Sequence, residues 1–169
     1  GITVQQNAGV GVNSWPGTPV ASTTSMPVTQ STVAESFGSR TSMAQTITIP
    51  AGTNETLQSV YLYAGGGNGV DASAPVRVNL YDLGAVTAPN PSSYAGGTNL
   101  LGGGAGVSIA YTSQAAGFLR LDFTGSDQVV LGAGHMYVFE LAGTGGTTPM
   151  NWYRTTSDTY TGGAAYTNG

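Results

Sequence analysis

The chain is 169 residues long and carries four arginines and no lysine against eight carboxylates, which gives a net charge of −4. This balance excludes nucleic acid and an anionic membrane surface as expected partners, because both require clustered positive charge. The absence of cysteine excludes disulfides, thiolate metal sites and a cysteine nucleophile.

Neutral polar residues dominate the composition. Charged residues make up 7% of the chain, whereas globular domains average about 25%, and there are 27 glycines and nine tyrosines. A surface of neutral hydrogen-bonding groups is typical of secreted, extracellular proteins, so we expect a mature fragment or an excised module of one. No apolar run approaches the roughly 20 residues of a membrane span, and the length predicts one domain with a sizeable core.

Strand patterns begin close to the first residue. Residues 1–29 are predicted to contain a first strand at 2–5 and an N-terminal arm that wraps the edge of the domain. Residues 30–169 are predicted to form the β-sandwich body of that same single domain. Strands are expected next at 32–37 and 43–49, where β-forming residues are bounded by turn-forming ones.

Two further strands are predicted in the middle of the chain, at 57–64 and 76–82. A long connection rich in proline, serine and glycine follows from 83 to 106, and connections of this length are often functional. The second of these strands alternates with a period of two, so successive side chains point to opposite faces. Its core face is predicted to carry Val76, Val78 and Leu80, and its other face Arg77, Asn79 and Tyr81.

The densest strand signal lies between residues 117 and 141. It predicts two core strands, with a short edge strand between them at 129–131, in one antiparallel sheet. The first core strand alternates between Leu119, Leu121 and Phe123 on one face and Phe118, Arg120 and Asp122 on the other.

No stretch of the chain shows apolar residues at helical spacing, and no fixed-period repeat is present. Short strands separated by turn signals instead predict an all-β fold. We expect an antiparallel β-sandwich of the jelly-roll type.

Few groups in the sequence could carry catalysis. His135, the only histidine, lies within a strand pattern, and we interpret it as a structural or rim histidine. No local motif pairs two carboxylates as a glycosidase requires, and the His and Cys spacings of a zinc site are absent. No cofactor is required, although a structural calcium ion held by loop carboxylates and carbonyls stays open without assigned ligands.

The arginines and aromatic residues predict a binding face. An arginine is almost never fully buried unless it is paired, so residues two positions away on the same strand should also face solvent, which makes Trp152 partly exposed beside Arg154. Rings next to guanidinium and amide groups suit sugars, because the CH face of a pyranose packs on a ring while its hydroxyls form hydrogen bonds. The predicted ligand-binding residues are Trp152, Arg154, Tyr81, Arg77, Asn79, Arg120, Asp122 and Phe118.

Three parts of the chain carry a family resemblance: AQTITI at 44–49 followed by LQSVYL at 57–62, then VRVNLYD at 76–82, then LGAGHMYVFEL at 131–141. Together, they resemble the non-catalytic β-sandwich carbohydrate-binding modules appended to secreted bacterial polysaccharide-degrading enzymes and found in surface-anchored proteins. The resemblance covers residues 43–166. It implies a secreted module that keeps an attached catalytic domain close to its polymer.

Three interpretations therefore stay open. The first is a non-catalytic, monomeric module that binds a polysaccharide, with room for an anionic polymer because guanidinium groups bind carboxylates bidentately. The second is a structural or adhesive sandwich domain whose rings are buried and whose arginines pair with Asp82 and Asp122. The third is a small glycan-active hydrolase or lyase, which a carboxylate pair or a tyrosine with an arginine in a cleft would favour. Exposure of Trp152 separates the first interpretation from the second.

Overall fold

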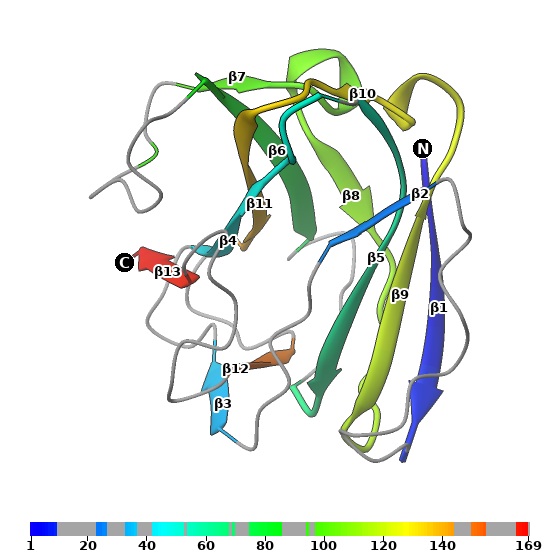
Figure 1. Ribbon diagram of the computed structural model, residues 1–169. Helices are drawn as coiled ribbons and strands as arrows, with labels where there is room; N and C mark the ends of the chain where they lie inside the picture. The colour runs from blue at the N-terminus through cyan, green and yellow to red at the C-terminus, as the bar shows by residue number, and fades with distance from the viewer. Residues whose placement is uncertain are drawn as a thin grey trace.

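A computed structural model gives the architecture, which is mostly β and consists of two sheets packed together (Figure 1). Among the residues that it describes, no helix is long and apolar enough to cross a membrane. Only the backbone is described at 23–26, 33–36, 153–154 and 165–168. The described residues are 1–9, 23–26, 33–36, 42–52, 54–67, 69, 75–85, 94, 97–143, 150–154 and 165–168.

The first sheet is built around β5 (Glu55–Gly65) and β9 (Gly117–Phe123), which pair antiparallel. Its strand order is β1-β9-β5-β12-β3, and β10 and β2 also pair with β5. β2 departs from the antiparallel pattern, since it runs parallel to β5. The other strands are β1 (Ile2–Ala8), β2 (Thr23–Met26), β3 (Val33–Ser36), β10 (Val130–Leu131) and β12 (Asn151–Arg154).

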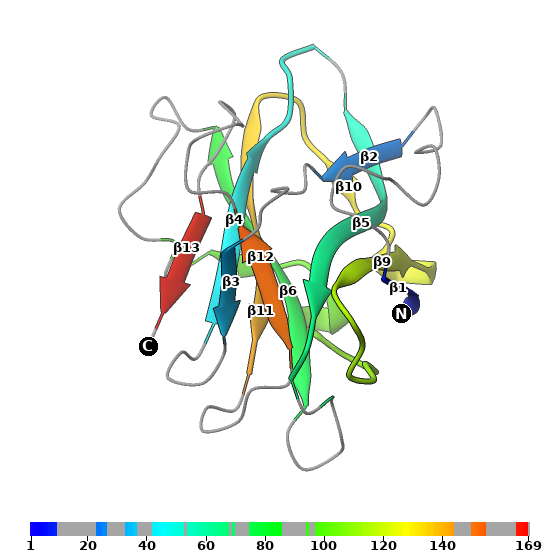
Figure 2. The ribbon, with the colours of Figure 1, turned by 90° about the horizontal axis from the view of Figure 1, so that it is seen from below.

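The second sheet is built around β11 (His135–Ala142), with β4 (Ser42–Thr48) on one side and β6 (Val76–Ala85) on the other. Its strand order is β13-β4-β11-β6-β7, and β8 pairs with β6. Figure 2 shows β4, β11 and β6 in one layer and β5, β9 and β1 in the other. The remaining elements are β7 (Thr98–Asn99), β8 (Val107–Ile109), β13 (Ala165–Asn168) and two short 3₁₀ turns, η1 (Gly102–Gly104) and η2 (Gly125–Asp127).

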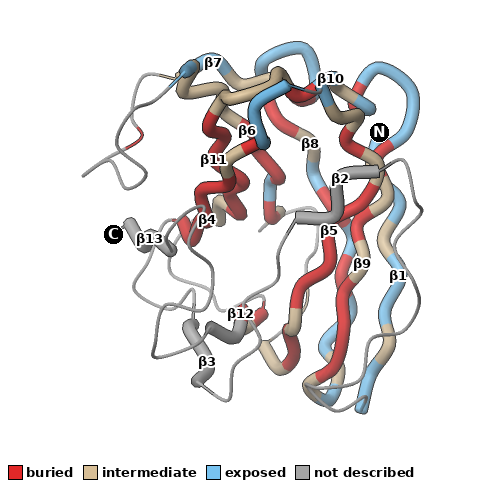
Figure 3. The backbone as a smooth tube through the Cα atoms, in the orientation of Figure 1, coloured by how far each residue is buried: buried red, intermediate tan, exposed pale blue. Residues whose placement is uncertain are grey.

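The hydrophobic core lies between the two sheets. The predicted alternation on β6 is confirmed, because Val76, Val78 and Leu80 are fully buried in this core. On β9, Leu119 and Leu121 are likewise fully buried between the layers, and burying one such side chain contributes roughly 1.5–3 kcal/mol. Figure 3 shows the result, with β5 and β9 largely buried and β1 mostly exposed or half-buried.

The segment between 117 and 141 confirms three strands but corrects their placement. β9 belongs to the first sheet and β11 to the second, while the short β10 pairs with β5. The two core strands therefore face each other across the core instead of pairing, which lets each bury its own apolar face. The all-β sandwich is confirmed, and jelly-roll connectivity stays a prediction.

Gly117 allows β1 to pair closely with β9. A Cβ atom at this position would lie 2.0 Å from the carbonyl oxygen of Asn7, where no real Cβ is tolerated. Glycine in a strand often marks such a close approach of two backbones. The pairing carries seven residues of β1, from Ile2 opposite Phe123 to Ala8 opposite Gly117.

Candidate functional site

The predicted site residues lie on different sheets. Arg120 and Asp122 belong to β9 in the first sheet, whereas Arg77 and Tyr81 belong to β6 in the second. The outer face of each sheet, meaning the face turned away from the other sheet, points in the opposite direction to its counterpart. The prediction that all these residues share one binding surface is therefore wrong.

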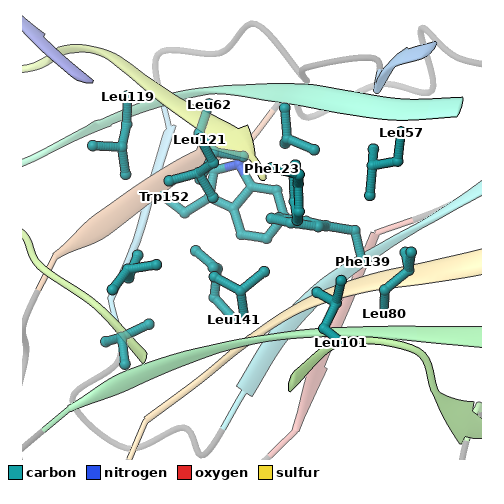
Figure 4. Packing of buried hydrophobic residues seen from close by; sticks show 14 of the residues in the cluster. Leu57, Leu62, Leu80, Leu101, Leu119, Leu121, Phe123, Phe139, Leu141 and Trp152 are labelled. Atoms are coloured by element: carbon teal, nitrogen blue, oxygen red, sulfur yellow. The ribbon is translucent and has the colours of Figure 1, made fainter. Parts of the chain in front are cut away.

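Trp152 is buried, which corrects the prediction that it is partly exposed. Only 7% of its surface is accessible, and its ring meets Phe139 edge-on with the centroids 5.9 Å apart. Figure 4 shows the indole among the leucines and phenylalanines between the sheets. A large apolar ring gains more from the core than from water, so alternation with a neighbouring arginine does not decide its side. The side chain of Arg154 lies outside the described residues.

Phe118 shares the outer face of the first sheet with Arg120 and Asp122, as alternation predicts. Its predicted exposure is wrong, however, because none of its surface is accessible. The ring packs edge-on against Tyr63, its partner in the β5–β9 register, with 5.5 Å between centroids. Phe118 is therefore a packing residue and cannot stack on a ligand.

Five neighbouring residues on the outer face of the first sheet, of which Tyr61 is buried, form what we call the Arg120 face. The strand register places Gln5 and Tyr61 on either side of Arg120. Arg120 Nε donates a 2.6 Å hydrogen bond to Asp122 Oδ1, and Gln5 Nε2 donates one of 2.9 Å to Asp122 Oδ2. The Arg120 face consists of Gln5, Tyr61, Tyr63, Arg120 and Asp122.

The Arg120 face combines accessible charge with fixed geometry. The side chains of Arg120 and Asp122 are 30% and 20% exposed, and Gln5 is exposed. The guanidinium carbon lies 5.4 Å from the centre of the Tyr61 ring, a cation–π distance. The hydrogen bond to Asp122 raises the pKa of Arg120, so the guanidinium stays charged. The ion pair adds little to stability, but it limits the orientations of both groups.

A second polar group lies on the outer face of the second sheet. Glu140 on β11 is 6% exposed and accepts three hydrogen bonds from neutral donors. These come from Asn79 Nδ2 at 2.8 Å, the Tyr81 hydroxyl at 3.5 Å and the Tyr94 hydroxyl at 2.5 Å. We call Asn79, Tyr81, Tyr94 and Glu140 the Glu140 cluster.

Three members of the Glu140 cluster are buried, and Tyr81 is half-buried. Asn79 and Tyr94 are only 7% and 8% exposed, which corrects the prediction that Asn79 binds a ligand. Burial and the hydrogen bond to Glu140 raise the pKa of the Tyr94 hydroxyl well above its usual value, and burial followed by the charge of Glu140 raises that of Tyr81. Both hydroxyls therefore stay protonated and donate. The cluster stabilises the position of Tyr94 on the sheet.

Sequence reasoning found only part of the Glu140 cluster. Alternation placed Asn79 and Tyr81 on one face, but no pattern in the sequence joined them to Glu140. No local signal connects Tyr94, in a long connection, with a strand 46 positions further along the chain. Arg77, also predicted, is exposed on the same sheet and donates to the carbonyl oxygen of Ala105.

His135 lies at the start of β11, where its Nδ1 is 3.1 Å from Asp82 Oδ1. Its side chain is 37% exposed and its ring stacks on Tyr137, which fits the interpretation as a rim histidine. Within the described part of the chain, no group of three or more acidic or histidine side chains converges as a metal site would require. The carboxylates of Asp71 and Asp158 lie outside the described residues.

Comparisons with protein-family models, curated proteins and solved structures found no match to this chain. Of the two polar groups on the outer faces, the Arg120 face has its charged side chains partly exposed, whereas the carboxylate of the Glu140 cluster is buried.

Proposed function

We propose that the chain is a secreted, non-catalytic, monomeric module that binds a polysaccharide and tethers an attached catalytic domain to it. The observation that carries this proposal is the Arg120 face. There, a partly exposed guanidinium and carboxylate on β9 lie beside an exposed amide on β1, and Arg120 and Asp122 hold each other in place. Alternation of the chain between the two sheets, with β4, β6 and β8 in one and β5 and β9 in the other, supports the finer proposal of a jelly roll.

The burial of two predicted stacking residues changes the expected mode of binding. Trp152 and Phe118 are withdrawn from any ligand, so a broad aromatic platform is not part of the proposal. Sugar hydroxyls both donate and accept hydrogen bonds. Hydrogen bonds to charged groups, such as Arg120 and Asp122, are stronger than those between neutral groups. Pre-organisation also reduces the ordering cost of binding. The proposed binding is therefore polar, with half-buried Tyr63 at the end of the surface.

Affinity electrophoresis against soluble polysaccharides tests the proposal. We expect at least one polymer to retard the protein. Arg120→Ala should reduce the free energy of binding to that polymer by about 2 kcal/mol, as for an interface arginine. Arg77→Ala is the matched control, because it removes an exposed arginine from the opposite sheet. Thermal unfolding confirms that both variants are folded. Retardation by no polymer, or equal loss in both variants, contradicts the proposal.

The second candidate function is a structural or adhesive sandwich domain. The burial of Trp152 in the core favours it, since exposure of this ring was the expected mark of a sugar-binding surface. Such a domain predicts wild-type migration in every polysaccharide gel. The same electrophoresis therefore separates the two candidates.

A further inference from the structure

We infer that the Arg120 face selects uncharged polysaccharides over polymers that bear carboxylates. The inference rests on the proposed function and names its ligand class. It differs from the sequence-based expectation that the arginines could bind an anionic polymer such as a uronate chain. What decides the class is the arrangement of charge around Arg120.

The positive charge of Arg120 is already matched within the protein. Its Nε, which forms one edge of the guanidinium fork, donates to Asp122 Oδ1 at 2.6 Å. Bidentate binding of a carboxylate uses two parallel N–H groups of the fork, and on this edge one of them is occupied. A carboxylate from the ligand would have to compete with Asp122 or use the remaining edge alone.

The carboxylate of Asp122 remains at the surface as a repulsive element. It is 20% exposed, and its second oxygen is fixed by the hydrogen bond from Gln5 Nε2. Like charges brought together at an interface are costly, and such repulsion is a common source of specificity. The net charge of −4 over the chain acts in the same direction at long range.

The groups left for a ligand suit hydroxyls. Arg120 keeps the N–H groups of its two terminal nitrogens as donors, and the Gln5 carbonyl oxygen accepts no hydrogen bond from the described residues. Asp122 offers its remaining lone pairs as acceptors. Gln5 lies directly opposite Arg120 on the neighbouring strand, and neighbouring strands are about 4.8 Å apart. Neighbouring hydroxyls on a sugar can use both kinds, whereas a carboxylate can use only the donors.

The test compares neutral and anionic polymers that share a backbone. The probes are hydroxyethylcellulose with carboxymethylcellulose, methyl-esterified pectin with polygalacturonate, and dextran with carboxymethyl dextran. We expect the full chain to bind the neutral member of at least one pair about tenfold more tightly than the anionic member. Because the Arg120–Asp122 pair has no net charge, raising the salt concentration should leave binding of the neutral polymer unchanged.

Asp122→Asn tests the cause of the selectivity. The substitution keeps the shape of the side chain but removes its charge, so the preference for the neutral polymer should shrink at least threefold and anionic binding should become salt-sensitive. Arg77→Gln, on the other sheet, should leave the preference unchanged, and thermal unfolding monitors folding of both variants.

The outcomes separate this inference from the proposed function. If the anionic member binds as tightly as the neutral one and Arg120→Ala abolishes that binding, the inference is overturned while the polysaccharide-binding function stands. An unchanged preference in a folded Asp122→Asn protein also overturns it. Retardation by none of the polymers overturns the proposed function, and the inference with it.

Discussion

The Tyr94 hydroxyl donates a 2.5 Å hydrogen bond to Oε2 of Glu140, which joins a long connection to the central strand of the second sheet. The same hydroxyl lies 3.1 Å from Oγ of Ser42 on β4. Tyr94 thus bridges two neighbouring strands on their outer face. A buried carboxylate is tolerated here because neutral donors satisfy it.

Tyr94→Phe should destabilise the fold by about 1–3 kcal/mol, because it leaves an oxygen of a buried carboxylate without a donor. Urea unfolding followed by tryptophan fluorescence measures the change in the free energy of unfolding. Thr3→Ala, at an exposed position of β1, is the control and should shift stability by less than about 0.5 kcal/mol. Equal midpoints for the two variants would show that the hydrogen bond does not stabilise the fold.

Trp152→Ala should destabilise the protein by about 3–5 kcal/mol, as expected for removing a large ring from a packed core. Trp152→Phe keeps an aromatic ring against Phe139 and should lose less. The free energy of unfolding of each variant, from denaturant titration, gives the comparison. A fully stable Trp152→Ala protein would contradict the placement of this ring between the sheets.

Gly117→Ala should weaken the attachment of β1, since the new Cβ would collide with the carbonyl oxygen of Asn7. We expect a loss of about 2 kcal/mol or more and faster amide exchange along β1. Gly9→Asn is the control, because Gly9 has a φ of +74° with open space around it, a conformation that asparagine tolerates. Protection of β1 amides at the wild-type level in Gly117→Ala would refute the close approach.

Stability in acid should depend on Asp127, which is 5% exposed. Burial raises the pKa of this carboxyl, but hydrogen bonding, which includes the 2.8 Å bond from the Gly102 amide, outweighs burial, so the pKa falls below its usual value. A carboxyl with a lowered folded-state pKa contributes stability above its unfolded pKa and loses it as the pH falls through the folded value.

The free energy of unfolding of the wild-type protein should therefore decline below about pH 3.8. That of the Asp127→Asn variant should decline less steeply. Urea titrations of both proteins between neutral and acid pH measure the two slopes. Parallel curves would mean that Asp127 does not contribute to the acid dependence.

Local pattern was enough to predict most strands and their faces. Val76, Val78 and Leu80 were assigned to the core, and Phe118 was assigned to the face of Arg120, because period-two alternation depends only on the backbone of one strand. The same rule failed for exposure. Phe118 is on the outer face yet buried, since what covers a face comes from elsewhere in the chain.

The sequence by itself determined an all-β chain, the approximate positions of the longer strands and which residues of β6 and β9 face the core, but it did not indicate β2, β7, β8 or β13. Only the tertiary structure decided that β9 and β11 belong to opposite sheets, that Trp152 points inward and that Tyr94 meets Glu140. The physical reason is range. Alternation is a property of neighbouring residues, whereas sheet membership and burial depend on pairings between strands far apart in the chain, which compete through the packing of the whole core.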